Sequence, residues 1–501
     1  MIVILLTLSL YTFRDMPKML IEGEGFYWLN KGLQSYFWRA FPRSLANLEV
    51  SAVLVGTLLT KMFGANLYLY NWTWLFVMMV INIFMFFMAY VITKNKLVSF
   101  GASLIFAVNY IAQWGYLGWT YTSFLERTIT VVFLIPSFLY LHLYMEKSKL
   151  KYFVISIALC FLGIGIGQWG LLFSVAFVVY PLFWHLFDFK AKKKILKRIF
   201  TSFTFLMICL FFLGLHNINQ SSLGPGYSFT SFLLNPKKYH YIEQIPFQLS
   251  HWSNYPNIFK GLIISKTEPN LLGIGYKGSI VQNFSDLEAN KKAANKILAI
   301  YLLTGLIIYL RLPKQRALLF TMIISITFLM ITSIYFGRYI PSIQAGATRY
   351  MYLPTIWLSV YWALVLWALF WQQKSNLQIF GFIILVSYYL INTQLISNNL
   401  KSRLYSKTSN MIAERDLVEY IKNITPKLSD NTLVITPWDE TSCPFNQFFN
   451  DQLGKGRVNF MLEQDSCAPE GGWKKVALES DHVIRLDYDH ENLRVIEEKI
   501  K

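Results

Sequence analysis

The chain has 501 residues, of which 54% are hydrophobic, 17% aromatic and only 15% charged. Soluble domains carry about 25% charged residues, so this composition excludes an ordinary aqueous protein, a disordered chain and a coiled coil. The formal net charge of +18 does not point to nucleic acid, because the basic residues gather in short loops between apolar runs, as the positive-inside rule describes. The sequence therefore predicts a polytopic membrane protein.

Apolar windows of about 20 residues, the length that crosses a bilayer, recur along residues 1–395. The opening run 1–13 has neither a basic n-region nor a small-residue cleavage site, so it is expected to be a first span and not a signal peptide. The other expected spans are 72–93, 98–116, 128–146, 152–168, 170–187, 199–216, 295–311, 317–336, 351–371 and 377–394. The expected fold is an all-α polytopic membrane domain of about eleven transmembrane helices.

The connections between these windows form two alternating sets. Lysine and arginine dominate the first set, at 94–96, 147–151, 190–198, 311–316 and 374. The second set is longer, mixed in sign and rich in aromatic residues, and comprises 14–71, 217–294, 337–350 and the tail 395–501. The positive-inside rule places the first set in the cytoplasm and the second set outside.

The composition changes after residue 395, where a second unit of residues 396–501 is expected. Residues 409–424 predict an amphipathic helix, with Leu417 and Ile421 on its apolar face. Strand-like runs separated by turn residues follow at 432–436, 457–462, 482–488 and 493–498. These elements predict a small extracytoplasmic α/β domain of about 90 residues, near the lower limit for independent folding. Whether Cys443 and Cys467 in this tail form a disulfide is left open.

The outer connections hold the candidates for chemistry. Asp15 directly follows the first span, and Glu22 and Glu24 come soon after it. An ionisable group at the mouth of a helix bundle is costly unless it pairs or acts in function. Asp15 therefore either pairs with Arg14 or caps a short helix, or it takes part in a reaction.

Arg349 begins the apolar run of another expected span. A guanidinium group at this depth can form two hydrogen bonds to a phosphate among the lipid headgroups. The alternative is an interfacial anchor in which Tyr350 and Tyr352 are belt aromatics. Glu126 has a similar alternative, a buried structural pair with Arg127. His142 and His185, at the cytoplasmic ends of spans, are expected to be snorkelling residues without a special role.

Four segments taken in order resemble one family of membrane enzymes. They are Phe13-Arg14-Asp15 after the first span, Arg43-Ser44-Leu45, the stretch from Phe106 to Tyr110 followed by Trp119 and Glu126, and Arg349-Tyr350-Met351-Tyr352-Leu353-Pro354. In this order they resemble the GT-C membrane glycosyltransferases, and among these the bacterial relatives of the protein O-mannosyltransferases. The last segment is the most similar. The chain departs from the family pattern where Met16, and not a second acid, follows Asp15.

The resemblance implies transfer of a sugar, with inversion, from a polyprenyl-phosphate or polyprenyl-diphosphate donor. The acceptor would be a protein or a lipid-linked glycan at the extracytoplasmic face, and the expected location is a bacterial inner membrane, with the endoplasmic reticulum as the alternative. The roles that the resemblance implies are Asp15 as base with Glu24 and Glu22 in reserve, Arg349 and Arg43 on the donor phosphate, and Tyr350, Tyr352, Trp119 and Glu126 at the substrate. The chemistry requires no metal, although some relatives carry a divalent ion in this acidic loop.

Three other functions stay open at this point. A transporter or flippase of lipid-linked glycans would show inverted repeats and ionisable residues at mid-depth of the membrane. A ligase of lipid-linked glycans would share the outer-face chemistry. A catalytically inactive GT-C-like scaffold is compatible with the altered acidic motif at Asp15 and Met16.

Overall fold

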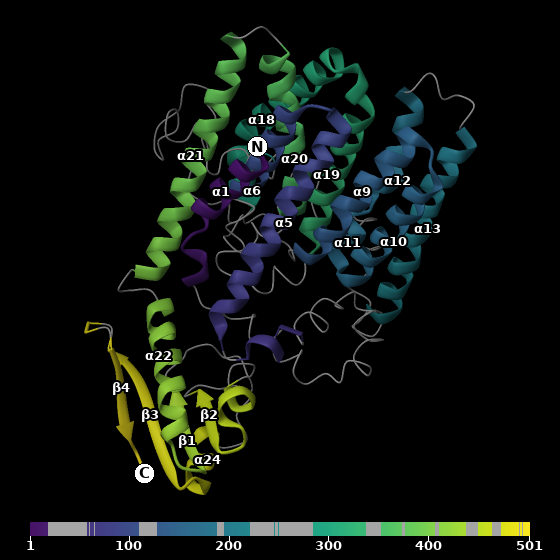
Figure 1. Ribbon diagram of the computed structural model, residues 1–501. Helices are drawn as coiled ribbons and strands as arrows, with labels where there is room; N and C mark the ends of the chain where they lie inside the picture. The colour runs from purple at the N-terminus through teal and green to yellow at the C-terminus, as the bar shows by residue number, and fades with distance from the viewer. Residues whose placement is uncertain are drawn as a thin grey trace.

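The structure is a computed structural model and consists mainly of helices, with a small sheet near the C-terminus (Figure 1). It describes residues 1–18, 58–59, 61–64, 66–109, 128–187, 195–220, 245, 249, 284–336, 352–372, 376–405, 410–436, 449–462, 472–489, 491–492 and 494–501. Within these residues, seven helical segments are long and apolar enough to cross a membrane, and the helices Lys96–Val108 and Leu150–Ile166 are apolar but shorter.

The helical bundle and the C-terminal unit follow one another along the chain. The bundle contains α1 (Ile2–Thr12), the 3-10 turn η1 (Met16–Lys18), α5 (Leu67–Thr93), α6 (Lys96–Val108), α9 (Ile129–Lys147), α10 (Leu150–Ile166), α11 (Gln168–Phe173), α12 (Val175–Phe187), α13 (Ile195–Gln220), α18 (Phe284–Arg311), η5 (Pro313–Gln315), α19 (Arg316–Phe336), α20 (Tyr352–Leu366) with the π-turn η7 (Trp367–Trp371), and α21 (Asn376–Tyr405). The C-terminal unit contains α22 (Asn410–Ile424), η8 (Thr425–Lys427), β1 (Thr432–Thr436), the π-turn η9 (Asn450–Gly454), β2 (Val458–Leu462), α24 (Gly472–Glu479), β3 (His482–Asp489) and β4 (Arg494–Lys499).

Most of the expected spans coincide with a helix, but several of their ends differ. The span expected over 98–116 is wrong at its end, because α6 stops at Val108 and the next residue, Asn109, is extended. Helix α21 is longer than the expected 377–394, since it continues to Tyr405. The break expected between 152–168 and 170–187 is confirmed: Gly167 adopts an extended conformation and separates α10 from α11.

Polar side chains hold α1 inside the bundle. This helix has 11 residues and therefore a length of about 16 Å, short of the roughly 30 Å hydrocarbon layer. Thr12 shares a hydrogen bond of 3.0 Å with Thr393 of α21, and Asn82 of α5 donates to Ser9 at 3.2 Å. Because lipid offers no hydrogen-bonding partner, these pairs favour packing of α1 against neighbouring helices.

Helices α9 and α10 form an antiparallel pair in which small residues meet. The Ser137 hydroxyl donates to the Ser156 carbonyl oxygen at 2.6 Å, and the Ser156 hydroxyl donates to the Ser137 carbonyl oxygen at 2.8 Å. Both serines are completely buried. Small hydroxyl residues let two membrane helices approach closely while their polar groups stay satisfied.

Helix α20 is the most deeply buried of the candidate spans. Its Trp357 stacks on Phe173 with a centroid separation of 5.2 Å and meets the ring edge of Phe138 at 4.9 Å. Both geometries are favourable for aromatic pairs. The core of the bundle therefore connects α20 with α9 and α11.

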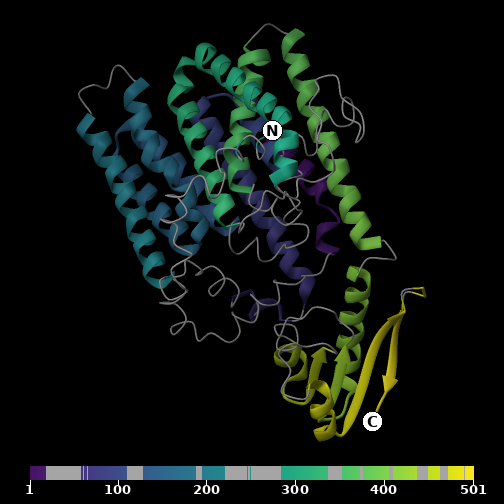
Figure 2. The ribbon, with the colours of Figure 1, turned by 180° about the vertical axis from the view of Figure 1, so that it is seen from behind.

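The basic connections come together at one end of the bundle. Lys94, which caps α5, lies 3.4 Å from Glu146 at the end of α9, and Lys197 at the start of α13 lies 3.5 Å from the carbonyl oxygen of Ser148. Gln315 of η5 donates to the carbonyl oxygen of Ile92. Helix α5 has 27 residues and spans about 40 Å, so its first residues lie at the opposite end, near the C-terminal unit (Figure 2).

The C-terminal unit is built on a four-stranded sheet of order β2-β1-β3-β4. Strand β1 pairs in parallel with β2 and β3, and β4 pairs antiparallel with β3. The four predicted strands and the amphipathic helix are confirmed to within two residues at each end. Alternate residues of a strand face opposite sides, so Leu433 and Ile435 pack under α24.

Helix α22 covers the other face of this sheet through its apolar stripe, in which Leu417 and Ile421 are buried as expected. Two tyrosine hydrogen bonds join α22 to the sheet. Tyr420 donates to the Glu497 carboxylate of β4 at 2.6 Å, and Tyr488 of β3 donates to Asp416 at 2.9 Å. The parallel strands run toward the helical bundle, so their carboxyl ends face it (Figure 1).

The close approach of α11 to the end of α10 predicts that Gly170 in α11 cannot be replaced by a larger residue without loss of stability. A Cβ atom on Gly170 would collide with the carbonyl oxygen of Gly163 and would lie 2.7 Å from Cα of Ile164. Backbone atoms cannot yield to it, so Gly170→Ala should lower the free energy of unfolding by about 1–3 kcal/mol. Gly214→Ala is the control, because no atom lies within 4 Å of its added Cβ. Unfolding in detergent should separate the two variants; equal stability would contradict the close approach.

The contact between Tyr420 and Glu497 predicts a pH dependence. The hydrogen bond to the carboxylate, followed by burial, raises the pKa of Tyr420 to about 12. Because this folded-state pKa exceeds the usual value near 10, the contact stabilises the fold fully below about pH 10, and this stabilisation is lost as the pH rises through about 12. Tyrosine-labelled NMR should show the Tyr420 pKa falling in Glu497→Gln and unchanged in Glu498→Gln, whose side chain points to the other face. An unshifted pKa in Glu497→Gln would contradict the contact.

Candidate active site

Two of the residues expected at a site, Asp15 and Tyr352, belong to the described part of the chain. The others lie outside the described residues: Glu22, Glu24, Arg43, Trp119, Glu126, Arg349 and Tyr350. Cys443 and Cys467 also lie outside them. The geometry of the site is therefore built from Asp15, Tyr352 and the side chains that surround these two.

The chain turns directly after α1, and this turn fixes Asp15. The amide of Met16 donates to the carbonyl oxygen of Phe13, and the amide of Lys18 donates to the carbonyl oxygen of Asp15. Pro17 suits the start of the 3-10 turn η1, where no amide donor is needed. Met16 and Pro17 are buried. The result is a buried carboxyl residue, 7% exposed, at the end of α1.

Two cations flank the Asp15 carboxylate. The ammonium group of Lys18 lies 2.7 Å from Oδ1, and Nε of Arg14 lies 3.9 Å from Oδ2. The Arg14 guanidinium also packs over the ring of Tyr11 at 4.3 Å. The pairing with Arg14 considered from the sequence is thus present, but Lys18 makes the shorter contact. The three side chains carry one net positive charge, and both cations are exposed.

Tyr352 begins α20 and is completely buried. Its ring packs against Phe106 of α6 at 5.4 Å, and its hydroxyl group points to Sδ of Met78 in α5 at 3.7 Å. A belt aromatic at the lipid surface would be exposed in the isolated protein, so that alternative is wrong for Tyr352. The residue instead joins the first turn of α20 to α5 and α6.

One face of α5 connects the surroundings of Asp15 and Tyr352. Phe13 meets the ring edge of Trp74 at 5.5 Å, while Tyr352 contacts Met78. Trp74 and Met78 are four residues apart, so they lie on the same face of the helix, about 6 Å apart along its axis. The end of α1 and the start of α20 thus reach neighbouring turns of α5, although 339 positions of sequence numbering separate Phe13 from Tyr352.

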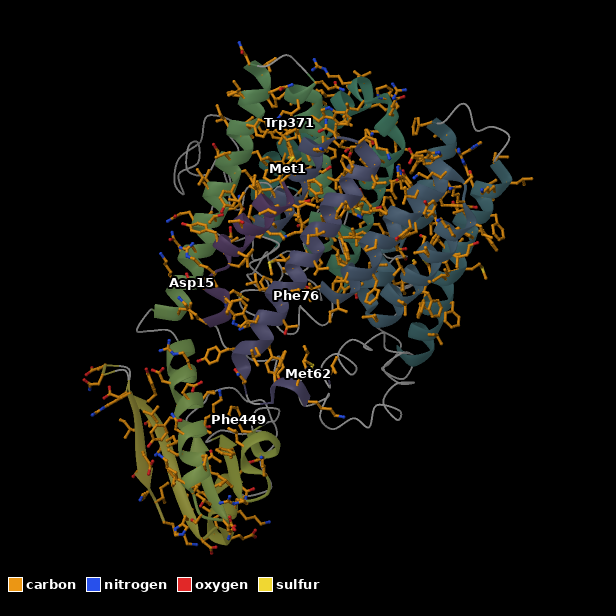
Figure 3. The ribbon with its side chains drawn as sticks, in the orientation of Figure 1. Met1, Asp15, Met62, Phe76, Trp371 and Phe449 are labelled. Carbon is orange, nitrogen blue, oxygen red and sulfur yellow. The ribbon has the colours of Figure 1, made fainter. Side chains whose placement is uncertain are left out.

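The C-terminal unit approaches the same end of α5. The ammonium group of Lys422 in α22 lies 5.8 Å from the ring centre of Tyr68, in the first turn of α5. Figure 3 shows Asp15 on the side of the bundle that faces the C-terminal unit with Phe449, whereas Trp371 lies toward the opposite end. Asp15, the start of α5 and α22 therefore share one end of the molecule, away from the basic turns.

The described residues contain no group of three His, Cys, Asp or Glu side chains that could hold a metal ion. Asp15 is a poor ligand for a divalent cation in its observed surroundings, because Lys18 already occupies one carboxylate oxygen and Arg14 adds positive charge. Whether Glu22 and Glu24 bind a metal concerns residues outside the described part of the chain.

Three residues of this region, Lys18, Trp74 and Met78, are not among those expected from the sequence. Lys18 follows Asp15 by three positions, and this spacing across Pro17 is the sequence feature that could have predicted their ion pair. No sequence feature predicted the contacts of Trp74 and Met78, since apolar residues in a predicted span do not reveal which residues they pack against. His142 was misjudged: it is 3% exposed and its Nδ1 lies 2.6 Å from the hydroxyl of Tyr180, so it is a core residue.

The Asp15 and Lys18 pair predicts a measurable coupling. Asp15 is nearly buried, whereas the Lys18 side chain is 57% exposed, so solvent screens the pair and the coupling energy should be about 0.5–1 kcal/mol. A double-mutant cycle of Asp15→Asn and Lys18→Gln, read by unfolding in detergent, measures it. The same cycle with Lys61 in place of Lys18 is the control and should give no coupling. A zero value for Lys18 would contradict the observed ion pair.

Comparison of the chain with known protein families and with curated proteins finds no match. The resemblance to GT-C glycosyltransferases therefore rests on the quoted segments of the sequence.

Proposed function

We propose that the protein is an integral-membrane glycosyltransferase that transfers a sugar from a polyprenyl-phosphate or polyprenyl-diphosphate donor to a protein or lipid-linked glycan acceptor at the extracytoplasmic face. The observation that carries this proposal is the shared face of α5. Phe13, two residues before Asp15, packs on Trp74, and Tyr352, three residues after Arg349, contacts Met78. This arrangement favours a common cavity for the Asp15 carboxylate and the Arg349 guanidinium.

The reaction would be a single displacement. The acceptor hydroxyl oxygen attacks the anomeric carbon, and a new carbon–oxygen bond forms there while the bond from that carbon to the phosphate oxygen breaks. The departing phosphate keeps the electron pair, and the Asp15 carboxylate takes the hydroxyl proton as general base. Lys18 holds Oδ1 of this carboxylate, so Oδ2 is the oxygen that would receive the proton. Glu24 and then Glu22 remain the reserve candidates.

The leaving phosphate needs positive charge and not a proton. Arg14 and Lys18 are exposed beside Asp15 and outnumber its single negative charge, so a phosphate would be attracted to this end of the bundle. Arg349 is proposed to bind the phosphate through two hydrogen bonds, with Arg43 as a second cation. Tyr350, Tyr352, Trp119 and Glu126 are proposed to shape the substrate cavity, and buried Tyr352 would do so by positioning the segment before α20.

The proposal includes about eleven spans, an outside C-terminal unit and a bacterial inner membrane. Support for the orientation comes from the basic turns, because Lys94, Lys197 and Ser148 meet at one end and positive charge favours the cytoplasm. The opposite end carries Asp15 and α22. A polyprenyl donor would place its chain beside the lipid-facing helices and its phosphate among the outer headgroups near Asp15.

A transporter or flippase is the competing function, and the fate of the sugar separates the two. The test uses the full chain in proteoliposomes with a radiolabelled polyprenyl-phosphate sugar and a membrane extract as the acceptor source. We expect label to move onto an acceptor in the wild type. Asp15→Asn should lower this transfer by about 10²–10⁴-fold, the usual cost of losing a general base, while the protein remains folded.

Asp430→Asn is the matched control, since it makes the same chemical change at an exposed carboxylate of the C-terminal unit that pairs with Arg457. It should retain full transfer. Undiminished transfer by Asp15→Asn would remove Asp15 from the base role. Movement of intact donor across the bilayer without any transfer would favour the flippase.

A further inference from the structure

The turn between α9 and α10 gathers positive charge at the end of the bundle opposite Asp15. Ser148 in this turn has a left-handed conformation with φ of 57°, and its amide donates to the carbonyl oxygen of Tyr144. The turn joins the end of α9 to the start of α10, and the end of α5 and the start of α13 meet it there. The lysines that they contribute are Lys94, Lys147, Lys149, Lys151 and Lys197, and the carboxylate that faces them is Glu146.

Ring and carbonyl contacts hold several of these ammonium groups near the turn. Lys197 lies 3.5 Å from the carbonyl oxygen of Ser148 and 4.5 Å from the ring centre of Tyr144. Lys147 and Lys151 lie 5.9 and 5.3 Å from the ring centre of Tyr152. Cations near a helix C-terminus also offset the helix dipole. One or two lysines would suffice to offset the dipole, so the positive charge of the remaining lysines is available to bind another anion.

An apolar strip runs from this cluster along the side of the bundle. On α10, Leu150 is 68% and Val154 55% exposed, and on α13, Leu196 is 79% and Phe200 61% exposed. Phe200 lies 6.4 Å from Phe153, which places the first turns of the two helices together. Helix α13 lies at the outer edge of the bundle (Figures 1 and 2), so the strip faces lipid in the membrane.

We propose that the α9–α10 turn and the start of α13 form a binding site for an anionic glycerophospholipid of the inner leaflet. The lysines bind the headgroup phosphate, with Lys149 and Lys151 as its main partners because both are exposed and carry no ion pair in the described part of the chain. The acyl chains lie along the exposed side chains of α10 and α13. Basic pockets between membrane helices bind anionic lipid headgroups in this way.

The test measures lipid affinity of the full chain in neutral detergent, by native mass spectrometry, with phosphatidylglycerol, phosphatidylcholine and inorganic phosphate. Phosphatidylglycerol should bind in a saturable manner and phosphatidylcholine much more weakly. Lys149→Gln and Lys151→Gln should each lower the phosphatidylglycerol affinity about fivefold, the effect of one lysine near a charged membrane surface. Glu146→Gln should raise it by a similar factor, since it removes the opposing charge.

Lys314→Gln is the control, because Lys314 is an exposed lysine of η5 at the same end of the bundle. It should bind phosphatidylglycerol as the wild type does. Equal affinity for phosphatidylcholine, equal affinity in Lys149→Gln and the wild type, or an equal loss in Lys314→Gln would each overturn the site. Displacement of phosphatidylglycerol by inorganic phosphate at similar concentration would show an ion site without the lipid contact, and would overturn the proposal as well.

Discussion

The burial of two aromatic anchors against one face of α5 is the interaction on which the rest of the arrangement depends. Trp74 and Met78 are each 1% exposed and receive Phe13 and Tyr352 from distant parts of the chain. Aromatic burial of this kind contributes more free energy than any exposed ion pair of the bundle. The position of Asp15 therefore follows from packing, and its contacts with Lys18 and Arg14 only orient a carboxylate that the core has already placed.

Those parts of the fold that depend on local pattern could be predicted from the sequence. The strands β1 to β4 alternate or are short β-branched runs between turn residues, and each was located within two residues. Helix α22 has a polar and an apolar face, so its periodicity was visible. The position of Asp15 at the end of a helix followed in the same way, because the charged residues Arg14 and Asp15 directly follow an apolar run.

Features that depend on tertiary contacts could not be predicted. Counting apolar residues extended α6 beyond Val108, since hydropathy does not register the end of the helix at Asn109, whose side chain donates to Tyr388 of α21. The same limit applies to His142, whose partner Tyr180 lies on another helix. The contacts of Trp74 and Met78 were hidden for this reason too: most residues of α5 are apolar, and the sequence does not tell which face meets which neighbour.

The reciprocal hydrogen bonds between Ser137 and Ser156 have a consequence for biogenesis. Each hydroxyl donates to a backbone carbonyl oxygen of the partner helix, and both residues are fully buried between α9 and α10. A single helix leaving the translocon would expose its serine to lipid, whereas in the paired helices both serine hydroxyl groups have a hydrogen-bond acceptor. The two helices are thus suited to partition into the bilayer together as a hairpin.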